Sequence, residues 1–86
     1  MEDHLKATRK VAVEDVYIPV KRKKSLEPKK IEAIAESMID EGQKTPIQVR
    51  QDKNRLVLVE GLHRLEACRA LGEDMIKAIF VQARRF

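Results

Sequence analysis

The sequence predicts an α+β fold in which a small mixed sheet carries two helices, in the order β-α-β-β-α-β. Three observations support this prediction. Apolar residues between positions 31 and 39 recur at intervals of three and four, which is the period of an amphipathic helix. Short runs rich in β-branched residues lie on both sides of that segment. Gly42, Gly61 and Gly72 stand where the pattern changes, so each is expected to begin or end an element.

Composition limits the class of protein. The 86 residues suffice for one small domain, and the 43% of hydrophobic residues indicate a globular chain. Aromatic residues make up only 3%, so an aromatic platform for base stacking is not expected. The net charge of +4 favours an acidic partner such as a nucleotide or a nucleic acid.

The single cysteine, Cys68, excludes an internal disulfide framework and favours a reducing compartment. No apolar run is long enough to span a membrane, and the first residues contain no secretory signal, so we predict a cytoplasmic protein. Two histidines, His4 and His63, with one cysteine do not provide a zinc site, and no metal-binding cage is predicted.

Residues 1–10 are polar and aperiodic, which predicts a flexible N-terminal arm before a domain at 11–86. Residues 11–20 carry β-branched side chains and Tyr17, and Pro19 places the predicted strand at a sheet edge. An exposed basic loop is predicted next. This loop consists of Lys21, Arg22, Lys23 and Lys24. Its side chains either are simply solvated or contact nucleic-acid phosphates.

The first helix is predicted over residues 25–41, with Pro28 in its first turn and Gly42 as its stop. Its buried stripe would comprise Ile31, Ile34, Ala35, Met38 and Ile39.

A hairpin is predicted to follow, with strands at 47–50 and 56–59 joined by a turn at 52–54. The second helix runs from about Leu62 to Leu71 and ends at Gly72. A last strand at 76–81 has apolar residues on both faces, which places it in the sheet interior. Cys68 stands between Leu65 and Leu71 at intervals of three, so we predict that it lies in the core.

Gly61 joins the second hairpin strand to the second helix. A glycine at such a junction lets backbone N–H groups approach an anion, and His63 and Arg64 in the first helical turn can add charge-assisted contacts. This stretch, Gly61-Leu62-His63-Arg64, therefore predicts a phosphate site. The alternatives are an ordinary turn glycine, a packed histidine and a surface arginine.

Residues 11–82 resemble the N-terminal domain of ParB partition proteins, and are equally similar to sulfiredoxin, which shares that fold. The resemblance is carried by Ser37, Pro46-Ile47-Gln48-Val49, the motif at 59–64, Ala67 and Gly72.

The four residues at 61–64 separate the two families. ParB proteins typically show Gly-Glu-Arg-Arg there, and sulfiredoxins show Gly-Cys-His-Arg. Leu62 replaces the sulfiredoxin cysteine and has no nucleophilic atom. Cys68 would stand about 240° around the helix axis from it, so sulfiredoxin-type reduction is the least favoured function.

The resemblance implies that Gly61, Leu62, His63 and Arg64 hold the phosphates of a nucleoside triphosphate, ATP or CTP, with Mg²⁺. Lys30 and Ser37 fall where sulfiredoxin has phosphate-facing residues on its first helix. One residue of the basic run at 21–24 corresponds to an arginine that precedes this helix in both families. Glu60 is the carboxylate that we consider as a catalytic or metal contact, the alternative being a surface charge.

Two functions follow from the resemblance. The first is a ParB-like module that binds a nucleotide or nucleic-acid phosphate in DNA maintenance, such as plasmid or chromosome partition, or in transcriptional regulation. Its partners would include DNA, another protein or a second copy of the chain. The alternative is an enzyme of the same fold, an NTP hydrolase, phosphotransferase or ParB-like nuclease. The helix-turn-helix and dimerisation segments of full partition proteins are not expected within 86 residues.

Overall fold

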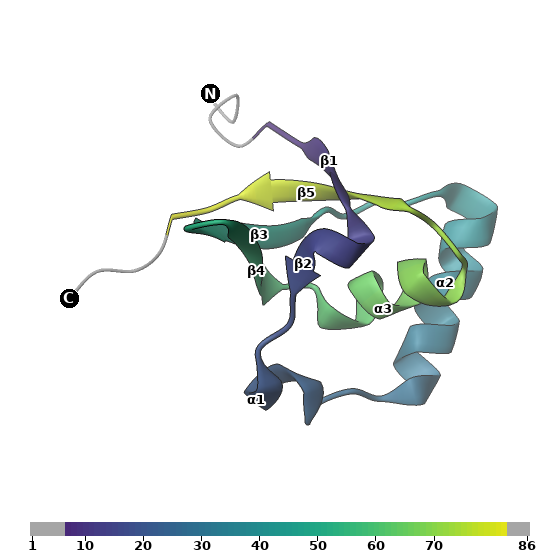
Figure 1. Ribbon diagram of the computed structural model, residues 1–86. Helices are drawn as coiled ribbons and strands as arrows, with labels where there is room; N and C mark the ends of the chain where they lie inside the picture. The colour runs from purple at the N-terminus through teal and green to yellow at the C-terminus, as the bar shows by residue number, and fades with distance from the viewer. Residues whose placement is uncertain (1–6, 83–86) are drawn as a thin grey trace.

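The computed structural model describes residues 7–82, which form a mixed five-stranded sheet and three helices (Figure 1). The predicted α+β class is confirmed. The elements are β1 (Arg9–Ala12), β2 (Val16–Tyr17), α1 (Val20–Lys23), α2 (Pro28–Glu41), β3 (Ile47–Asp52), β4 (Arg55–Glu60), α3 (Leu62–Ala70) and β5 (Met75–Phe80).

The strands lie in the order β1-β5-β3-β4-β2. β1 pairs antiparallel with β5, and β3 with β4, whereas β3 and β5, and β2 and β4, are parallel. The predicted hairpin is present as β3 and β4, joined through Lys53 with a positive φ of 57°. β5 has a neighbour on each side, as its apolar residues on both faces predicted.

The predicted strand at 11–20 is wrong in detail, because this segment forms two short strands on opposite edges of the sheet. Strand β1 begins at Arg9, and a 3-10 turn at Val13–Asp15 separates β1 from β2. The Val13 N–H donates to the Asp74 carbonyl at 2.8 Å. Val13 and Val16 are both buried, and their spacing of three residues suits a helical turn better than the alternation of a strand.

The predicted basic loop is also wrong in detail. Residues Val20–Lys23 form the single helical turn α1, which Pro19 precedes as the N-cap. None of the four helical residues is buried. Because a helical turn sends successive side chains in different directions, the basic residues of this turn do not share one environment.

Both longer helices lie on the same side of the sheet, with α3 between the sheet and α2 (Figure 1). Helix α3 buries four side chains, whereas α2 buries none completely. Since α2 packs mainly on α3, only a narrow stripe of it is covered, and Ile39 of the predicted stripe is 69% exposed. The helix begins at Pro28, three residues later than predicted, with Pro28 in its first turn and Gly42 as its stop as predicted.

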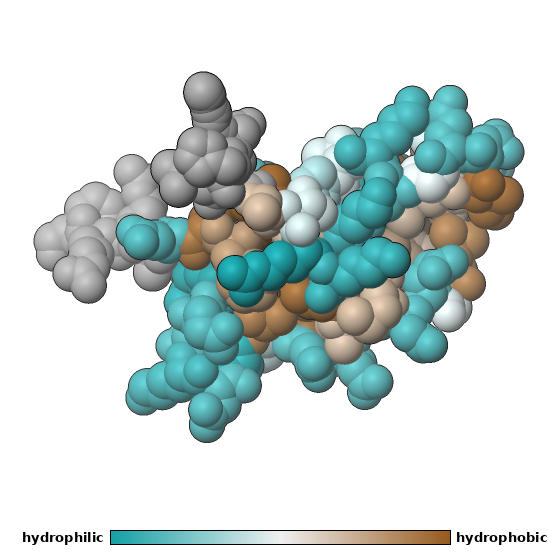
Figure 2. All heavy atoms as spheres, turned by 90° about the horizontal axis from the view of Figure 1, so that it is seen from above, coloured by the Kyte–Doolittle hydropathy of each residue, from teal (hydrophilic) through white to brown (hydrophobic). Residues whose placement is uncertain are grey.

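The core lies between the sheet and α3. Ile47, Val49 and Leu65 have no exposed surface, and Cys68 is 2% exposed, which confirms its predicted place in the core. The register sets Tyr17, Val57 and Arg50 side by side on the opposite face of the sheet. Figure 2 shows the molecule from above, where hydrophilic side chains cross and surround patches of apolar ones.

Among residues 7–82, no helix is long and apolar enough to cross a membrane.

Candidate anion-binding site at the β4–α3 junction

Gly61 is the N-cap of α3 and adopts a left-handed conformation with φ 107°. A Cβ atom at this position would lie 2.6 Å from Ile47 Cγ2 and 2.9 Å from Ile47 Cβ. Ile47 is fully buried in the core. The fold therefore requires glycine here for two reasons, a positive φ and a close approach, before any ligand is considered.

The first turn of α3 presents free backbone donors. Its first hydrogen bond is the one that the Leu65 N–H donates to the Gly61 carbonyl at 2.9 Å. Glycine has no side chain to cap the turn, and no other described side chain caps it. The N–H groups of residues 62–64 thus remain available at the positive end of the helix.

A cavity of about 450 Å³ opens beside these donors. It brings together the predicted residues Glu60, Gly61, Leu62, His63 and Arg64. Leu62 is 4% exposed and its side chain belongs to the core, so it offers its backbone N–H. The other residues that line the cavity come from distant segments, and among them only Arg22 had been predicted as a site residue. They are Arg22, Ser25, Ile34, Thr45, Pro46 and Gln48.

Arg22 is the member of the basic run that reaches the cavity. Its Nη2 lies 3.3 Å from Glu60 Oε1, and both side chains are partly exposed, at 38% and 61%. Lys23 lines a different hollow, and neither Lys21 nor Lys24 lines this cavity. Arg22 is thus the one residue of the run at 21–24 that lines this cavity, and its match to the arginine implied by the resemblance stays a prediction.

His63 joins the two helices at this site. Its Nε2 accepts a hydrogen bond from the Glu27 N–H, the N-cap of α2, at 3.0 Å. A nitrogen that accepts carries no proton, so Nδ1 is the donor that the neutral ring retains for another group. His63 is therefore partly engaged in holding the start of α2.

Lys30 and Ser37 do not line the cavity. Both are exposed on α2, four residues before and three residues after Ile34, which does line it. The Lys30 Nζ lies 3.2 Å from Glu27 Oε2. Their predicted contact with phosphate stays a prediction, and a ligand would have to extend along α2 to reach them.

Glu60 is the carboxylate of this cavity. Its pairing with Arg22 engages the group that we had considered for catalysis or metal contact. Within residues 7–82, no three histidine, cysteine or acidic side chains gather where they could hold a metal ion.

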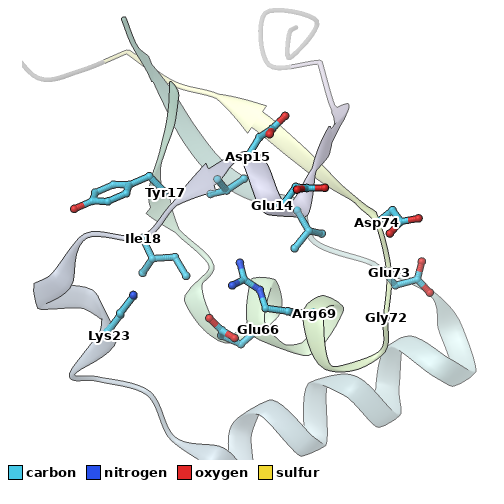
Figure 3. Close-up of a pocket in the computed structure, with 12 residues that line it drawn as sticks. Glu14, Asp15, Tyr17, Ile18, Lys23, Glu66, Arg69, Gly72, Glu73 and Asp74 are labelled. Carbon is cyan, nitrogen blue, oxygen red and sulfur yellow. The ribbon is translucent and has the colours of Figure 1, made fainter. Parts of the chain in front are cut away.

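A larger hollow, of about 650 Å³, lies between the 3-10 turn and α3 (Figure 3). Arg69 and Glu66 rise into it from α3, and Lys23 approaches from α1. Five of its seven charged lining residues are acidic, and they would repel phosphate. This excludes the hollow as a nucleotide-phosphate site; the carboxylates are Glu14, Asp15, Glu66, Glu73 and Asp74.

Cys68 faces the core and is a free thiol. Burial raises its pKa, Glu73 raises it further, and Arg64 lowers it to a smaller extent. A pKa raised by folding means that the protonated thiol stabilises the native state. This contribution is complete below the pKa of the unfolded thiol and is lost as the pH rises through that of the folded one.

We therefore expect Cys68 to react with a thiol reagent far more slowly in the folded protein than in urea. The free energy of unfolding should also fall at alkaline pH. Urea titrations between neutral and alkaline pH would measure this fall, and a Cys68→Ala variant should lack the part that is due to the thiol. A fast reaction in the native state would contradict the buried position.

The sequence model of the ParB N-terminal domain family matches residues 2–85. The chain belongs to this family, and the resemblance inferred from its motifs is confirmed. A comparison with curated proteins found no significant match.

Solved structures show the same fold. Sulfiredoxin from Arabidopsis thaliana has a TM-score of 0.81 and 23% identity, covering 90% of this chain and 86% of that one. The chromosome-partitioning protein ParB from Caulobacter crescentus, complexed with CTP-gamma-S, has a TM-score of 0.78 and 18% identity over 91% of this chain. A mutant free serine kinase in complex with ADP has a TM-score of 0.74 and 18% identity over 86% of this chain. The matched region spans 46% of the ParB chain and 30% of the kinase chain.

Proposed function

We propose that this domain binds the phosphates of a nucleoside triphosphate, ATP or CTP, at the start of α3. The observation that carries the proposal is the convergence of unlike anion-binding groups on one cavity. Free N–H groups of α3 lie there together with His63 and Arg64 from the same turn and Arg22 from α1. A helix N-terminus and guanidinium groups both favour phosphate oxygens.

The comparisons support the ligand class. The similar ParB structure carries a CTP analogue, and the similar kinase structure carries ADP. In this chain, the Arg22–Glu60 pair would open as a phosphate takes the place of the carboxylate. A nucleotide commonly brings Mg²⁺ with it, and Glu60, once released, is the carboxylate of the cavity that fits such an ion.

The cellular role that we propose is a regulatory one, in DNA maintenance or transcriptional regulation, through partners of the module. The alternative, an enzyme of this fold, would need a positioned base besides the phosphate clamp. Glu60 is the carboxylate of the cavity, and once released it would contact Mg²⁺ instead of serving as a base. The binding function therefore has the better support from the described residues.

Titration with ATP or CTP and Mg²⁺, followed by amide resonances, tests the proposal. We expect the resonances of residues 61–64 to shift, and an Arg64→Gln variant to lose most of that shift. A His63→Gln variant separates the two tasks of the histidine, because the glutamine Oε1 can take the place of Nε2 and still accept from the Glu27 N–H. Unchanged spectra at millimolar nucleotide would refute the site. Incubation with the nucleotide, with Glu60→Gln as control, would show whether it is also consumed.

A further inference from the structure

A second cationic cleft lies on the other side of Pro46, which lines both it and the candidate site. It is formed where β1, the start of β3 and β5 meet, and its volume is about 370 Å³. Within residues 7–82, every charged residue that lines it is a cation. The lining consists of Thr8, Arg9, Lys10, Lys44, Pro46 and Lys77.

The cations of this cleft are exposed, and among residues 7–82 only Lys44 has an acidic partner. Lys44 pairs with Glu41 at 2.6 Å, and the Lys77 Nζ donates to the Gln43 carbonyl at 3.4 Å. Arg9 lies over the Phe80 ring at 4.9 Å. Within residues 7–82, Lys10 has no ion-pair partner. The cleft therefore holds excess positive charge near water, where a phosphate can approach.

The sheet register sets two of these lysines directly against each other. Lys10 of β1 is opposite Lys77 of β5 in the antiparallel pair. The Lys77 N–H and carbonyl both bond to the Gln43 side chain, at 2.7 and 3.0 Å, and so point away from β1. The two lysines thus form a non-hydrogen-bonded pair, the arrangement in which side chains lie closest. Like charges opposite each other destabilise a sheet, and a bound anion would remove that repulsion.

The lining identifies the chemistry of the anion. A protein partner normally requires an apolar or aromatic centre in its interface, and the described residues that line this cleft include no large apolar side chain. Unstacked bases would likewise find no aromatic platform there. A duplex backbone needs only cations and hydrogen-bond donors, which these lysines, Arg9 and the Thr8 hydroxyl supply.

We propose that this cleft binds the phosphate backbone of duplex nucleic acid without reading its sequence. This proposal goes beyond the nucleotide site, because the cleft lies on the other side of Pro46. Binding of nucleic acid in the cleft does not require a nucleotide in that site. It also replaces the basic run at 21–24 as the main nucleic-acid contact, because Arg22 is paired with Glu60 and Lys23 faces the acidic hollow.

Fluorescence anisotropy with a labelled DNA duplex of arbitrary sequence, at several salt concentrations, tests the proposal. The affinity of the unaltered chain should fall steeply with salt. Each cation that contacts a phosphate adds about 0.9 to the slope of log affinity against log salt. A Lys10→Gln, Lys44→Gln, Lys77→Gln triple variant should therefore lose two to three units of slope, roughly 0.9 for each lysine removed, and bind at least tenfold more weakly at low salt.

Two control variants keep the test decisive. Lys21→Gln with Lys24→Gln removes two charges outside the cleft and should change affinity far less. Lys10→Arg with Lys77→Arg keeps the charge and should retain binding, which separates a charge effect from a folding defect. The melting temperature of a Lys10→Gln variant should be no lower than that of the unaltered chain, because the substitution removes the repulsion between Lys10 and Lys77.

Three outcomes would overturn the proposal. These are salt-insensitive binding, equal losses in the cleft and control variants, and tighter binding of polyglutamate than of the duplex at the same charge concentration. The last outcome would indicate an acidic protein instead. The nucleotide titration of the triple variant distinguishes the two proposals, because a failure of DNA binding would leave the amide shifts of residues 61–64 in place.

Discussion

Among the Gly→Ala substitutions at the three glycines, Gly61→Ala should lower the free energy of unfolding the most. The new Cβ would meet Ile47 at 2.6 Å, well inside contact distance, at a position with φ 107°. Overpacking a core costs about 1–3 kcal/mol, and a left-handed conformation adds about 1–2 kcal/mol for a residue with a side chain. We expect a total loss of about 2–5 kcal/mol in the free energy of unfolding, a large part of the roughly 5–15 kcal/mol typical of a domain.

Gly72→Ala is the matched control. Gly72 has a similar positive φ of 75°, but a Cβ there would meet nothing within 4 Å. Its cost should therefore be the conformational part alone, about 1–2 kcal/mol. Urea denaturation of both variants, followed by circular dichroism, measures the difference. If both variants lost the same free energy of unfolding, the contact between a Cβ at position 61 and Ile47 would not be the reason for glycine there.

An Arg22→Gln substitution should weaken nucleotide binding by about 10- to 100-fold. Hydrogen bonds to charged groups contribute about 1.5–3 kcal/mol, and each 1.4 kcal/mol is tenfold in affinity. Stability should change little, because the pair that Arg22 forms with Glu60 is largely exposed. Isothermal titration calorimetry with ATP or CTP would measure the affinity.

Two further variants decide whether Arg22 acts by contact or merely by charge. Lys21→Gln removes the same charge one residue away, outside the cavity, and should leave the affinity within a few-fold of the original. Glu60→Gln should strengthen binding of the nucleotide without Mg²⁺, because it frees Arg22 and removes a negative charge from the cavity. If Arg22→Gln and Lys21→Gln had the same small effect, Arg22 would not be a ligand.

The parts of the fold that the sequence predicted correctly are those with a local signal. Gly42, Gly61 and Gly72 all adopt a positive φ and mark the ends or the start of helices as expected. The hairpin was evident from its turn residues. By contrast, the two-residue strand β2 is recognisable only through its pairing with Leu56 and Val57, far along the chain. Ile39 fits the stripe by periodicity, yet it is exposed because α2 packs mainly on α3.

The candidate site divides in the same way. Residues 60–64 are contiguous, so one motif predicted that they would meet. Thr45 and Ser25 reach the cavity from other segments, and no local pattern marks them as site residues. Gln48 stands in a motif that carries the family resemblance, but that motif gave no sign that it lines the cavity. The choice of Arg22 among four basic residues depends on the direction in which α1 leaves Pro19, which is a property of the packed chain.

The two edges of the sheet come from one short segment, since β1 and β2 are separated by a single 3-10 turn. β1 pairs with β5, and β2 pairs with β4, so the edge strands are made early in translation while their partners are made late. Such distant pairings carry a high cost in chain entropy and form slowly. β1 therefore cannot pair until β5 has been synthesised, whereas β2 needs only β4. We expect a nascent chain halted before residue 75 to leave Val13 more exposed than the folded domain does, and so to be more prone to aggregation.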